Sequence, residues 1–592
     1  MMALRVSPNG GLDRSSSFGG QISMLVTCLL VLAINVLSFN GSVRAPRTSG
    51  KRRRPLPHQS LLSTPSSLGS TVAPSSSPPS CSSHHAKSSL NIIIQWRGEN
   101  DEGYSSSLRE LEFECAFKAE VKDVLRFDLD HFESREDVET CLRGVHFRYQ
   151  DALAYAGPVY HPDTVNGPDD SDAASGEPIP ASQVAVFERA MQYVMVDLPP
   201  SLDAVLDASR LRSIFVDTVR RCSLIRTSFE LVSEADSYKQ LAANALENKS
   251  CDDLMQAGVN NNSTWSIRLR RYASLNPTNK QARYGKNVRS PLRDERKAIA
   301  EMADLVRLFR GKVDLAEPKC KIYLLEGLRK NKLCGDDGGG DEGSQRLIMA
   351  RVLAQGPKVS MYSPKERICV TTTPLCPIAA FTMCNVAQIQ RRATPSILDP
   401  FAGSCATLLA ASHITNTQSL QRPSDWPPTS SGCKAVGVEI CHSGYVNRDD
   451  IVSDFETRGL PPPAAIIRGD SLSYEVRQRA RDTIGGGPFD VVVCDPPYGI
   501  REAFQDDGNE DAISPLTQLM YAMGKDRSNG NPLLVRGGRL VSFVPVRAGE
   551  TLSECLPELQ AQEFAGLTID GEGKEQVLSD TLSRYLVCFC SK

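Results

Sequence analysis

A tetrapeptide, Asp495-Pro496-Pro497-Tyr498, follows the apolar run at residues 489–494 and combines groups that can orient an aromatic amine. The Asp495 carboxylate and the Pro496 carbonyl can both accept hydrogen bonds from an exocyclic amine, which points the nitrogen lone pair at an activated methyl group. Two prolines fix φ and stiffen the loop, and the Tyr498 ring offers a face for a stacked base. The tetrapeptide is therefore predicted to be catalytic, with no metal required; an ordinary turn after a strand is the alternative.

Other polar residues at the ends of apolar runs predict a pocket for S-adenosylmethionine. The turn from Asp399 to Gly403, which includes Phe401, has small residues that let the backbone approach a ligand closely. Glu439 ends the second run and can accept hydrogen bonds from ribose hydroxyls, and Asp470 follows the third run and can accept from the adenine amine. A single loop of this kind often only turns a strand into a helix, but three ends in this order indicate a nucleotide-like cofactor.

The strands that position these residues are predicted from the alternation of apolar runs and helical stretches over residues 345–592. This alternation predicts an α/β fold with a doubly wound, Rossmann-like methyltransferase sheet. Ligands bind such sheets beyond the carboxyl ends of the strands, where the residues named above fall. The expected strands lie at residues 397–399, 435–439, 464–468, 489–494 and 540–545.

The preceding residues, 90–334, show a different pattern and are expected to form a separate α+β region. Residues 90–96 and 194–198 are typical of strands, and residues 203–217 carry apolar side chains at helical spacing. Gly and acidic residues at 335–344 are typical of a flexible linker between the two parts.

A basic stretch between residues 265 and 300 is the predicted RNA-binding segment. The body of the chain is acidic, so a nucleic-acid site must be a local patch of this kind. Trp265, Tyr272 and Tyr284 are expected to stack on unpaired bases; a solvated basic loop and helix face is the alternative. The basic residues expected to contact RNA are Arg268, Arg270, Arg271, Lys280 and Arg283.

Residues 1–89 are expected to be a largely disordered targeting presequence. Residues 24–37 are an apolar run too short for a comfortable membrane span, and the following tract is rich in Ser, Pro and Arg without acids. This order resembles the two-part plastid presequence of algae with secondary plastids, which predicts an organellar location and a mature chain without stable membrane association. A membrane anchor, an incorrect start codon and a cytoplasmic location are the alternatives.

The 18 cysteines include no C-x-x-C pair. Scattered thiols in a reducing compartment are therefore expected, and no zinc site is expected in this chain.

The quoted residues resemble the family of tRNA guanine-10 N2-methyltransferase catalytic subunits, which are THUMP-containing class I amino-methyltransferases. The resemblance rests on residues 495–502, 399–403 and 580–588, and it extends into the front part at residues 311–315 and 323–326. It implies methyl transfer from S-adenosylmethionine to the exocyclic amine of guanine, at position 10 of tRNA. It also implies ferredoxin-like and THUMP domains within 90–334 that bind tRNA, and a small zinc-binding activator subunit that forms a heterodimer with the chain.

Two residues depart from the family's pattern. Residues 373–377 resemble its cofactor-contacting segment, which implies a cofactor contact for Thr373, but Cys376 stands where the family has Asp. Cys405 stands where the family has a second Gly. An adenine-N6 or DNA amino-methyltransferase, and a catalytically silent RNA-binding subunit, remain the alternatives to guanine methylation.

Overall fold

The computed structural model describes residues 92–97, 106–125, 135–150, 154–155, 191–247, 263–271, 291–329, 346–391, 393–417, 432–440, 446–498 and 513–592. All of the described residues belong to one compact unit, His85–Lys592. The expected presequence and the expected linker at 335–344 lie outside the described residues.

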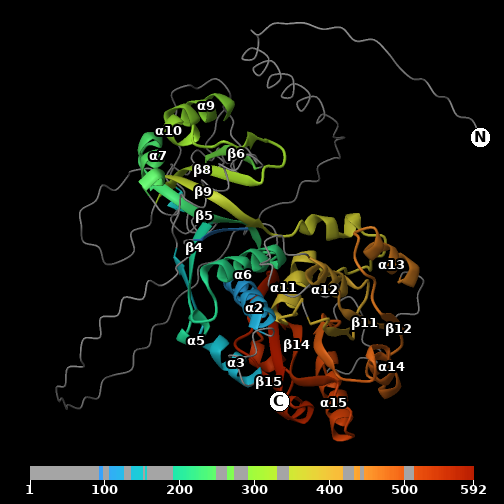
Figure 1. The fold of residues 1–592 in the computed structure, drawn as a ribbon. Helices are drawn as coiled ribbons and strands as arrows, with labels where there is room; N and C mark the ends of the chain where they lie inside the picture. Colours follow the sequence, from blue (N-terminus) through green and yellow to red (C-terminus); the bar gives the residue numbers. More distant parts are fainter. Residues whose placement is uncertain are drawn as a thin grey trace, which may run out of the picture. The chain divides into compact units, whose positions relative to one another are not determined.

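The first sheet is mixed and has nine strands in the described residues, with the path β2-β4-β1-β5-β9-β8-β6-β7 and β3 paired with β8 (Figure 1). Neighbours are antiparallel except for β6, which is parallel to β7 and β8. The strands are β1 (Ile92–Trp96), β2 (His146–Gln150), β3 (Ala154–Tyr155), β4 (Met191–Asp197), β5 (Ile225–Ala235), β6 (Thr264–Arg271), β7 (Lys312–Val313), β8 (Cys320–Arg329) and β9 (Arg346–Gln355).

Helices pack against this sheet in two groups, each with its own apolar core. Phe113, Phe117 and Phe215 form an aromatic cluster that joins two of the helices to the strands, and a second core surrounds Trp265 and Phe309. The helices of this part are α2 (Ser106–Leu125), α3 (Arg135–Arg143), α5 (Pro200–Asp203), α6 (Ala208–Arg221), α7 (Tyr238–Glu247), α9 (Pro291–Glu301) and α10 (Ala303–Val306).

The second sheet follows the order β12-β11-β10-β13-β14-β17-β15, with β16 paired with β17. The strands from β12 to β14 are parallel, and β17 is antiparallel to β14. This is the expected doubly wound sheet, with its first strand at the centre. The strands are β10 (Ser396–Asp399), β11 (Lys434–Glu439), β12 (Ala465–Arg468), β13 (Phe489–Cys494), β14 (Leu534–Arg547), β15 (Leu567–Ile569), β16 (Lys574–Ser579) and β17 (Leu582–Ser591).

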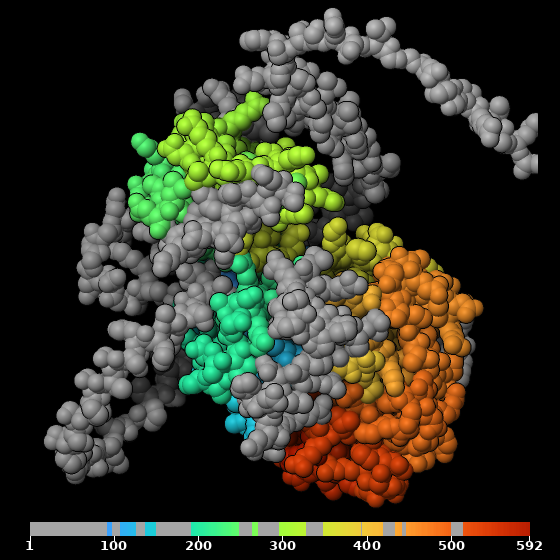
Figure 2. Space-filling view, viewed as in Figure 1, coloured from blue at the N-terminus to red at the C-terminus, as the bar shows by residue number. Residues whose placement is uncertain are grey.

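Both faces of the second sheet are covered by helices because successive side chains of a strand point to opposite faces. On β13, Val491 and Val493 belong to the core formed with α11 to α13, and Val492 belongs to the core formed with α14, α15 and α17. Figure 2 shows the orange surface near residues 450–490 next to the red surface of residues 513–592. The helices are η4 (Val359–Tyr362), η5 (Pro364–Glu366), α11 (Pro377–Val386), α12 (Ala406–Asn416), α13 (Arg448–Glu456), α14 (Tyr474–Ile484), α15 (Pro515–Ser528), α16 (Leu552–Cys555) and α17 (Leu559–Ala565).

The expected strands are confirmed with small shifts at their ends, except that β14 begins six residues before the expected start at residue 540. Two other details of the prediction are wrong. The helix expected at 203–217 is two helices, α5 and α6, because the Asp207 side chain accepts from the Arg210 amide and caps a new start. In addition, β9 pairs with β5 and β8, so the first sheet continues to Gln355, past the expected boundary at residue 345.

A buried ionic network joins α2 and α6 to the chain around α11. Arg391 contacts Glu120 at 2.5 Å and Asp217 at 2.6 Å, and Glu120 also binds Arg221. Glu112 accepts hydrogen bonds from Asn385 of α11 and from the amides of residues 223 and 224. Buried charges are tolerated when each has partners of this kind, so α2 is an integral part of the interface with the second sheet.

The described cysteines are all free, and most are buried. Among the described residues, no helix is long and apolar enough to cross a membrane, and no cluster of His, Cys, Asp and Glu side chains could hold a metal ion.

Candidate active site

Parallel pairing brings the ends of four strands to one edge of the second sheet. Asp399 ends β10, Glu439 ends β11, Asp470 follows β12, and Asp495 follows β13. The register pairs Asp399 with Gly437 and places Glu439 opposite Arg468. The predicted cofactor residues and the predicted catalytic loop therefore share the edge at which such sheets bind ligands.

Asp399 lies inside the turn that follows β10, where it is 2% exposed. Its carboxylate accepts hydrogen bonds from the Phe401 amide at 3.0 Å and from the Thr407 hydroxyl. Burial raises the pKa of Asp399 to about 7, and the nearby charges of Asp495 and Glu439 act in the same direction. Asp399 thus holds the turn together from within, while the half-buried Phe401 packs on the core beside α14 and α15.

Gly403 links this turn to the end of β11. Its φ of +49° lies in the left-handed region, and its amide donates to Glu439 Oε2 at 2.8 Å. The Thr371 methyl group lies 3.6 Å from the position that a Gly403 Cβ would take. Thr373, the residue predicted from the sequence, is half-buried in the same segment, two positions further along.

Cys405 adopts a left-handed conformation, with φ of 62° and ψ of 36°, as the residue before α12. This conformation favours glycine, which accounts for the family's Gly at this position. The side chain is fully buried, and Sγ lies 3.4 Å from the position that a Cβ on Gly437 would take. The thiol therefore fills the space between α12 and β11.

Cys376 is the residue before the first turn of α11 and provides no side-chain cap to the helix. An Asp at such a position accepts from the amides of the first turn, so the Asp-to-Cys departure removes a capping acceptor.

Asp470 is exposed, and its Oδ1 accepts from the Leu472 amide at 2.8 Å. That hydrogen bond fixes the carboxylate at the start of the turn between β12 and α14.

The predicted catalytic tetrapeptide is held by an arginine from the last strand. The Tyr498 hydroxyl donates to Asp495 Oδ1, and Arg584 of β17 donates to the Tyr498 hydroxyl at 3.0 Å and to Asp495 Oδ2 at 3.4 Å. Pro496 is buried and Pro497 is half-buried. Burial and the charge of Asp495 raise the pKa of Tyr498 well above its usual value, so the phenol stays a donor at neutral pH.

Arg584 and Thr407 are site residues that the sequence did not single out. Thr407 lies eight positions after Asp399, in the first turn of α12, and the Asp-Thr spacing was a usable but weak signal. Arg584 lies 89 positions after Asp495. It falls in a segment that carries the family resemblance, but a single Arg on a strand has no pattern that marks it as part of a site.

The predicted RNA-binding stretch is only partly described. Trp265 lies on β6, is 8% exposed and donates from Nε1 to the Gly311 carbonyl at 2.9 Å, so the expectation that it stacks on bases is wrong. Arg268 donates to the Leu315 carbonyl at 3.1 Å. The backbones of Arg270 and Arg271 end β6, whereas Lys280 and Arg283, with Tyr272 and Tyr284, lie outside the described residues.

The curated relatives that match the chain in sequence carry the same protein name. The chain is 25% identical to tRNA (guanine(10)-N(2))-methyltransferase TRMT11 of Xenopus laevis over 311 residues, 47% of this chain and 57% of the relative. It is also 25% identical to the human protein of that name over 315 residues, 47% of this chain and 60% of the relative. The chain thus spans little more than half the length of these relatives.

No family model matches the chain. Among solved structures, TrmN from Thermus thermophilus matches 67% of this chain and 89% of its own, at 13% identity and a TM-score of 0.27. Over roughly half its length, the chain is therefore similar in sequence to curated vertebrate tRNA (guanine(10)-N(2))-methyltransferases.

Proposed function

We propose that the chain transfers a methyl group from S-adenosylmethionine to the exocyclic amine of a guanine in tRNA, at position 10. The observation that carries the proposal is the Asp495-Pro496-Pro497-Tyr498 loop at the carboxyl end of β13, beside the strand ends that carry Glu439 and Asp470. The similarity to TRMT11 proteins supports guanine in tRNA as the substrate.

The donor set at the sheet edge fits S-adenosylmethionine. Glu439 has one carboxylate oxygen bound by the Gly403 amide, which orients the other oxygen for ribose hydroxyls. Asp470 presents an exposed carboxylate for the adenine amine. Bound S-adenosylmethionine supplies a methyl group on a positively charged sulfur. The left-handed Gly403 keeps the turn after β10 free of a side chain, which allows close approach of a ligand.

The chain's own residues would act by positioning the amine. Asp495 and the Pro496 carbonyl accept from its two hydrogens, so the nitrogen lone pair is held in one direction. The Tyr498 ring offers a stacking face for a base that has left its stack. After methyl transfer the amine loses a proton, for which the Asp495 carboxylate is the adjacent acceptor.

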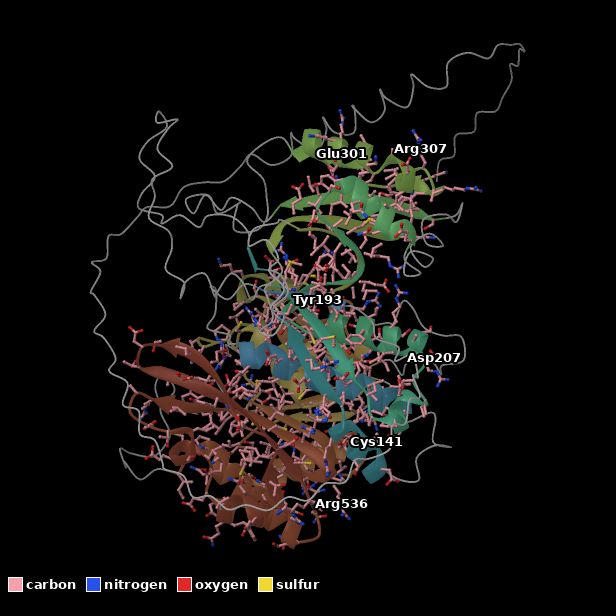
Figure 3. The ribbon with its side chains drawn as sticks, turned by 90° about the vertical axis from the view of Figure 1, so that its left-hand side faces the viewer. Cys141, Tyr193, Asp207, Glu301, Arg307 and Arg536 are labelled. Atoms are coloured by element: carbon pink, nitrogen blue, oxygen red, sulfur yellow. The ribbon has the colours of Figure 1, made fainter. Side chains whose placement is uncertain are left out.

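The front part is the proposed tRNA-binding region. The exposed basic side chains Arg310 and Lys312 lie next to the exposed apolar residues Leu308, Val313 and Leu315, a combination suited to phosphates and unpaired bases. Figure 3 shows the nearby Glu301 and Arg307 on the outer side of α9 and α10.

We further propose a small zinc-binding activator subunit and an organellar, plastid location. The first is supported by the family resemblance of residues 495–502, and the second by the composition of residues 1–89. Co-purification of the tagged chain with a small zinc-containing protein, and microscopy of a fluorescent fusion, test the two separately.

The proposed function is tested by replacing the catalytic carboxylate. Asp495→Ala should lower methyl transfer to tRNA by about two orders of magnitude or more, because the amine loses its acceptor, while tRNA binding stays. Mass spectrometry of nucleosides should detect N2-methylguanosine in tRNA treated with the wild-type chain and its activator.

Asp482→Ala, at an exposed acid of α14, is the matched control and should retain activity. Methylation of adenine or DNA by the wild-type chain would instead favour the alternative amino-methyltransferase. Full activity of Asp495→Ala would show that the active site lies elsewhere.

A further inference from the structure

Arg584 reaches the catalytic loop from β17 as a buried cation. Its side chain is 7% exposed, and its register partners are Pro545 on β14 and Gln576 on β16. One terminal nitrogen serves both Asp495 and Tyr498, at 3.4 and 3.0 Å. Burying a guanidinium costs free energy unless the group is paired. The buried position of Arg584 therefore depends on its contacts with the Asp495–Tyr498 loop.

Two further contacts fix the plane of the guanidinium. Nε donates to Gln576 Oε1 at 2.8 Å, and Gln576 is itself buried. The carbon at the centre of the guanidinium lies 3.9 Å from the ring centroid of Phe543, within cation–π range. Because the guanidinium is planar and held at both its face and its Nε edge, its terminal nitrogen has a defined direction toward the loop.

The two oxygens of Asp495 therefore have different partners. Oδ2 faces the charged Arg584, and Oδ1 accepts from the neutral hydroxyl of Tyr498. The Arg584 guanidinium, 3.4 Å from Oδ2, also attracts the carboxylate through its charge, and such attraction is stronger in a buried site than in water. The Tyr498 hydroxyl also has a second partner in Arg584, so it keeps a hydrogen bond if it leaves Asp495.

We propose that Arg584 is a positioning residue for an exchange of partners at Asp495 when the substrate binds, an inference that rests on the proposed function. The target amine replaces the Tyr498 hydroxyl on Oδ1 of Asp495, while Arg584 keeps Oδ2 and retains the displaced hydroxyl. No covalent bond forms or breaks in this exchange, and no proton is transferred. Arg584 thereby keeps the Asp495 carboxylate in place while the phenol is away from it.

The test compares Arg584→Gln with Arg584→Lys and with Arg539→Gln. Arg539 is a matched control, because it is a largely buried Arg of β14 that contacts Cys588 and Asp570 instead of the loop. Arg584→Gln should lower kcat for tRNA methylation about 10- to 100-fold, with KM for S-adenosylmethionine unchanged and with partial rescue by Lys. Arg539→Gln, at similar thermal stability, should retain kcat.

The exchange with Tyr498 makes a further distinction. Tyr498→Phe removes the hydroxyl, so the effect of Arg584→Gln on kcat should be smaller in that background than in the wild type. If Arg584→Gln lowers kcat by the same factor in the Tyr498→Phe background as in the wild type, the exchange is overturned. Equal kcat values for Arg584→Gln and Arg539→Gln would overturn the positioning role.

A readout without activity separates this inference from the proposed function. In protein labelled with 3-fluorotyrosine, the Tyr498 fluorine resonance is assigned by its absence in Tyr498→Phe. It should move in Arg584→Gln and stay in Arg539→Gln; an unmoved resonance would overturn the contact. If the resonance moves in Arg584→Gln but the wild-type chain methylates no tRNA, the proposed function is overturned and the Arg584 contact is still supported.

Discussion

At the scale of single residues, the site contains carboxylates with different surroundings. Asp399 is buried inside its turn, Asp470 is exposed, and Asp495 lies at 23% exposure between a phenol and a guanidinium. Because all three acids lie at strand ends, the sequence predicted that each faces a ligand. Only the structure shows that Asp399 stabilises its turn, whereas Asp470 and Asp495 can reach a ligand. The reason is that burial depends on packing across the sheet, which a local pattern does not contain.

The raised pKa of Asp399 predicts a pH dependence of stability. An acid whose pKa rises on folding, here to about 7, stabilises the folded state at low pH. This contribution is lost as the pH rises from about 4, the unfolded value, through about 7. The free energy of unfolding of Asp399→Asn, relative to wild type, should therefore increase over that interval.

Urea unfolding at several pH values measures this difference, with Asp482→Asn as the exposed control. The control should show no comparable trend. If the free energies of unfolding of Asp399→Asn and wild type differ by a constant amount from pH 4 to 8, the raised pKa of Asp399 is contradicted.

At the scale of elements, the five parallel strands of the second sheet were predictable, whereas its antiparallel strands and the strand partners in the first sheet were not. Runs such as Phe489–Cys494 are apolar along their whole length, because a parallel strand is buried on both faces. In contrast, β9 joins β5 and β8 by long-range pairing, and Arg584 meets Asp495 only because β17 lies beside β14. Local sequence gives the type of an element but not its neighbours.

The turn between β10 and α12 predicts an order of stability among substitutions at Cys405. Glycine adopts the observed φ of 62° without strain, whereas valine is branched at Cβ and is disfavoured there. There is also little room for added atoms beside Gly437. Cys405→Val should therefore unfold with a free energy about 2 kcal/mol or more below that of Cys405→Gly.

Urea unfolding of the two variants and the wild type gives this order directly. Cys405→Gly should lie near wild type, since relief of the left-handed strain offsets the loss of a small buried thiol. Equal stability of the Val and Gly variants would show that the turn relaxes to another conformation.

At the scale of the whole molecule, the formal net charge of −3 means that the proposed substrate tRNA, a polyanion, would need a local basic surface. The basic stretch remains the predicted RNA-binding segment, but Trp265 proved to be a core residue, because an aromatic at alternate strand spacing faces the core. Arg310 and Lys312, just beyond that stretch in sequence, are exposed.

Neutralising Arg310 and Lys312 together should weaken tRNA binding and reduce the slope of log K against log salt by about one for each phosphate that is no longer neutralised. Filter binding at several salt concentrations measures the slope. Arg479→Gln with Arg536→Gln, at exposed residues around the second sheet, removes the same charge and should leave the slope unchanged. Equal slopes for the two double variants would remove Arg310 and Lys312 from the binding surface.

The ionic network around α2 has a consequence for how the protein is made. Glu120 leaves the ribosome 271 residues before its partner Arg391, an interval on the order of tens of seconds during synthesis. Until Arg391 has been synthesised, the face of α2 that carries Glu120 among apolar side chains lacks the surface that covers it in the folded protein. A nascent chain halted after β9 would therefore expose this face to chaperones, and the front half is expected to reach its native packing only once the chain around α11 has emerged.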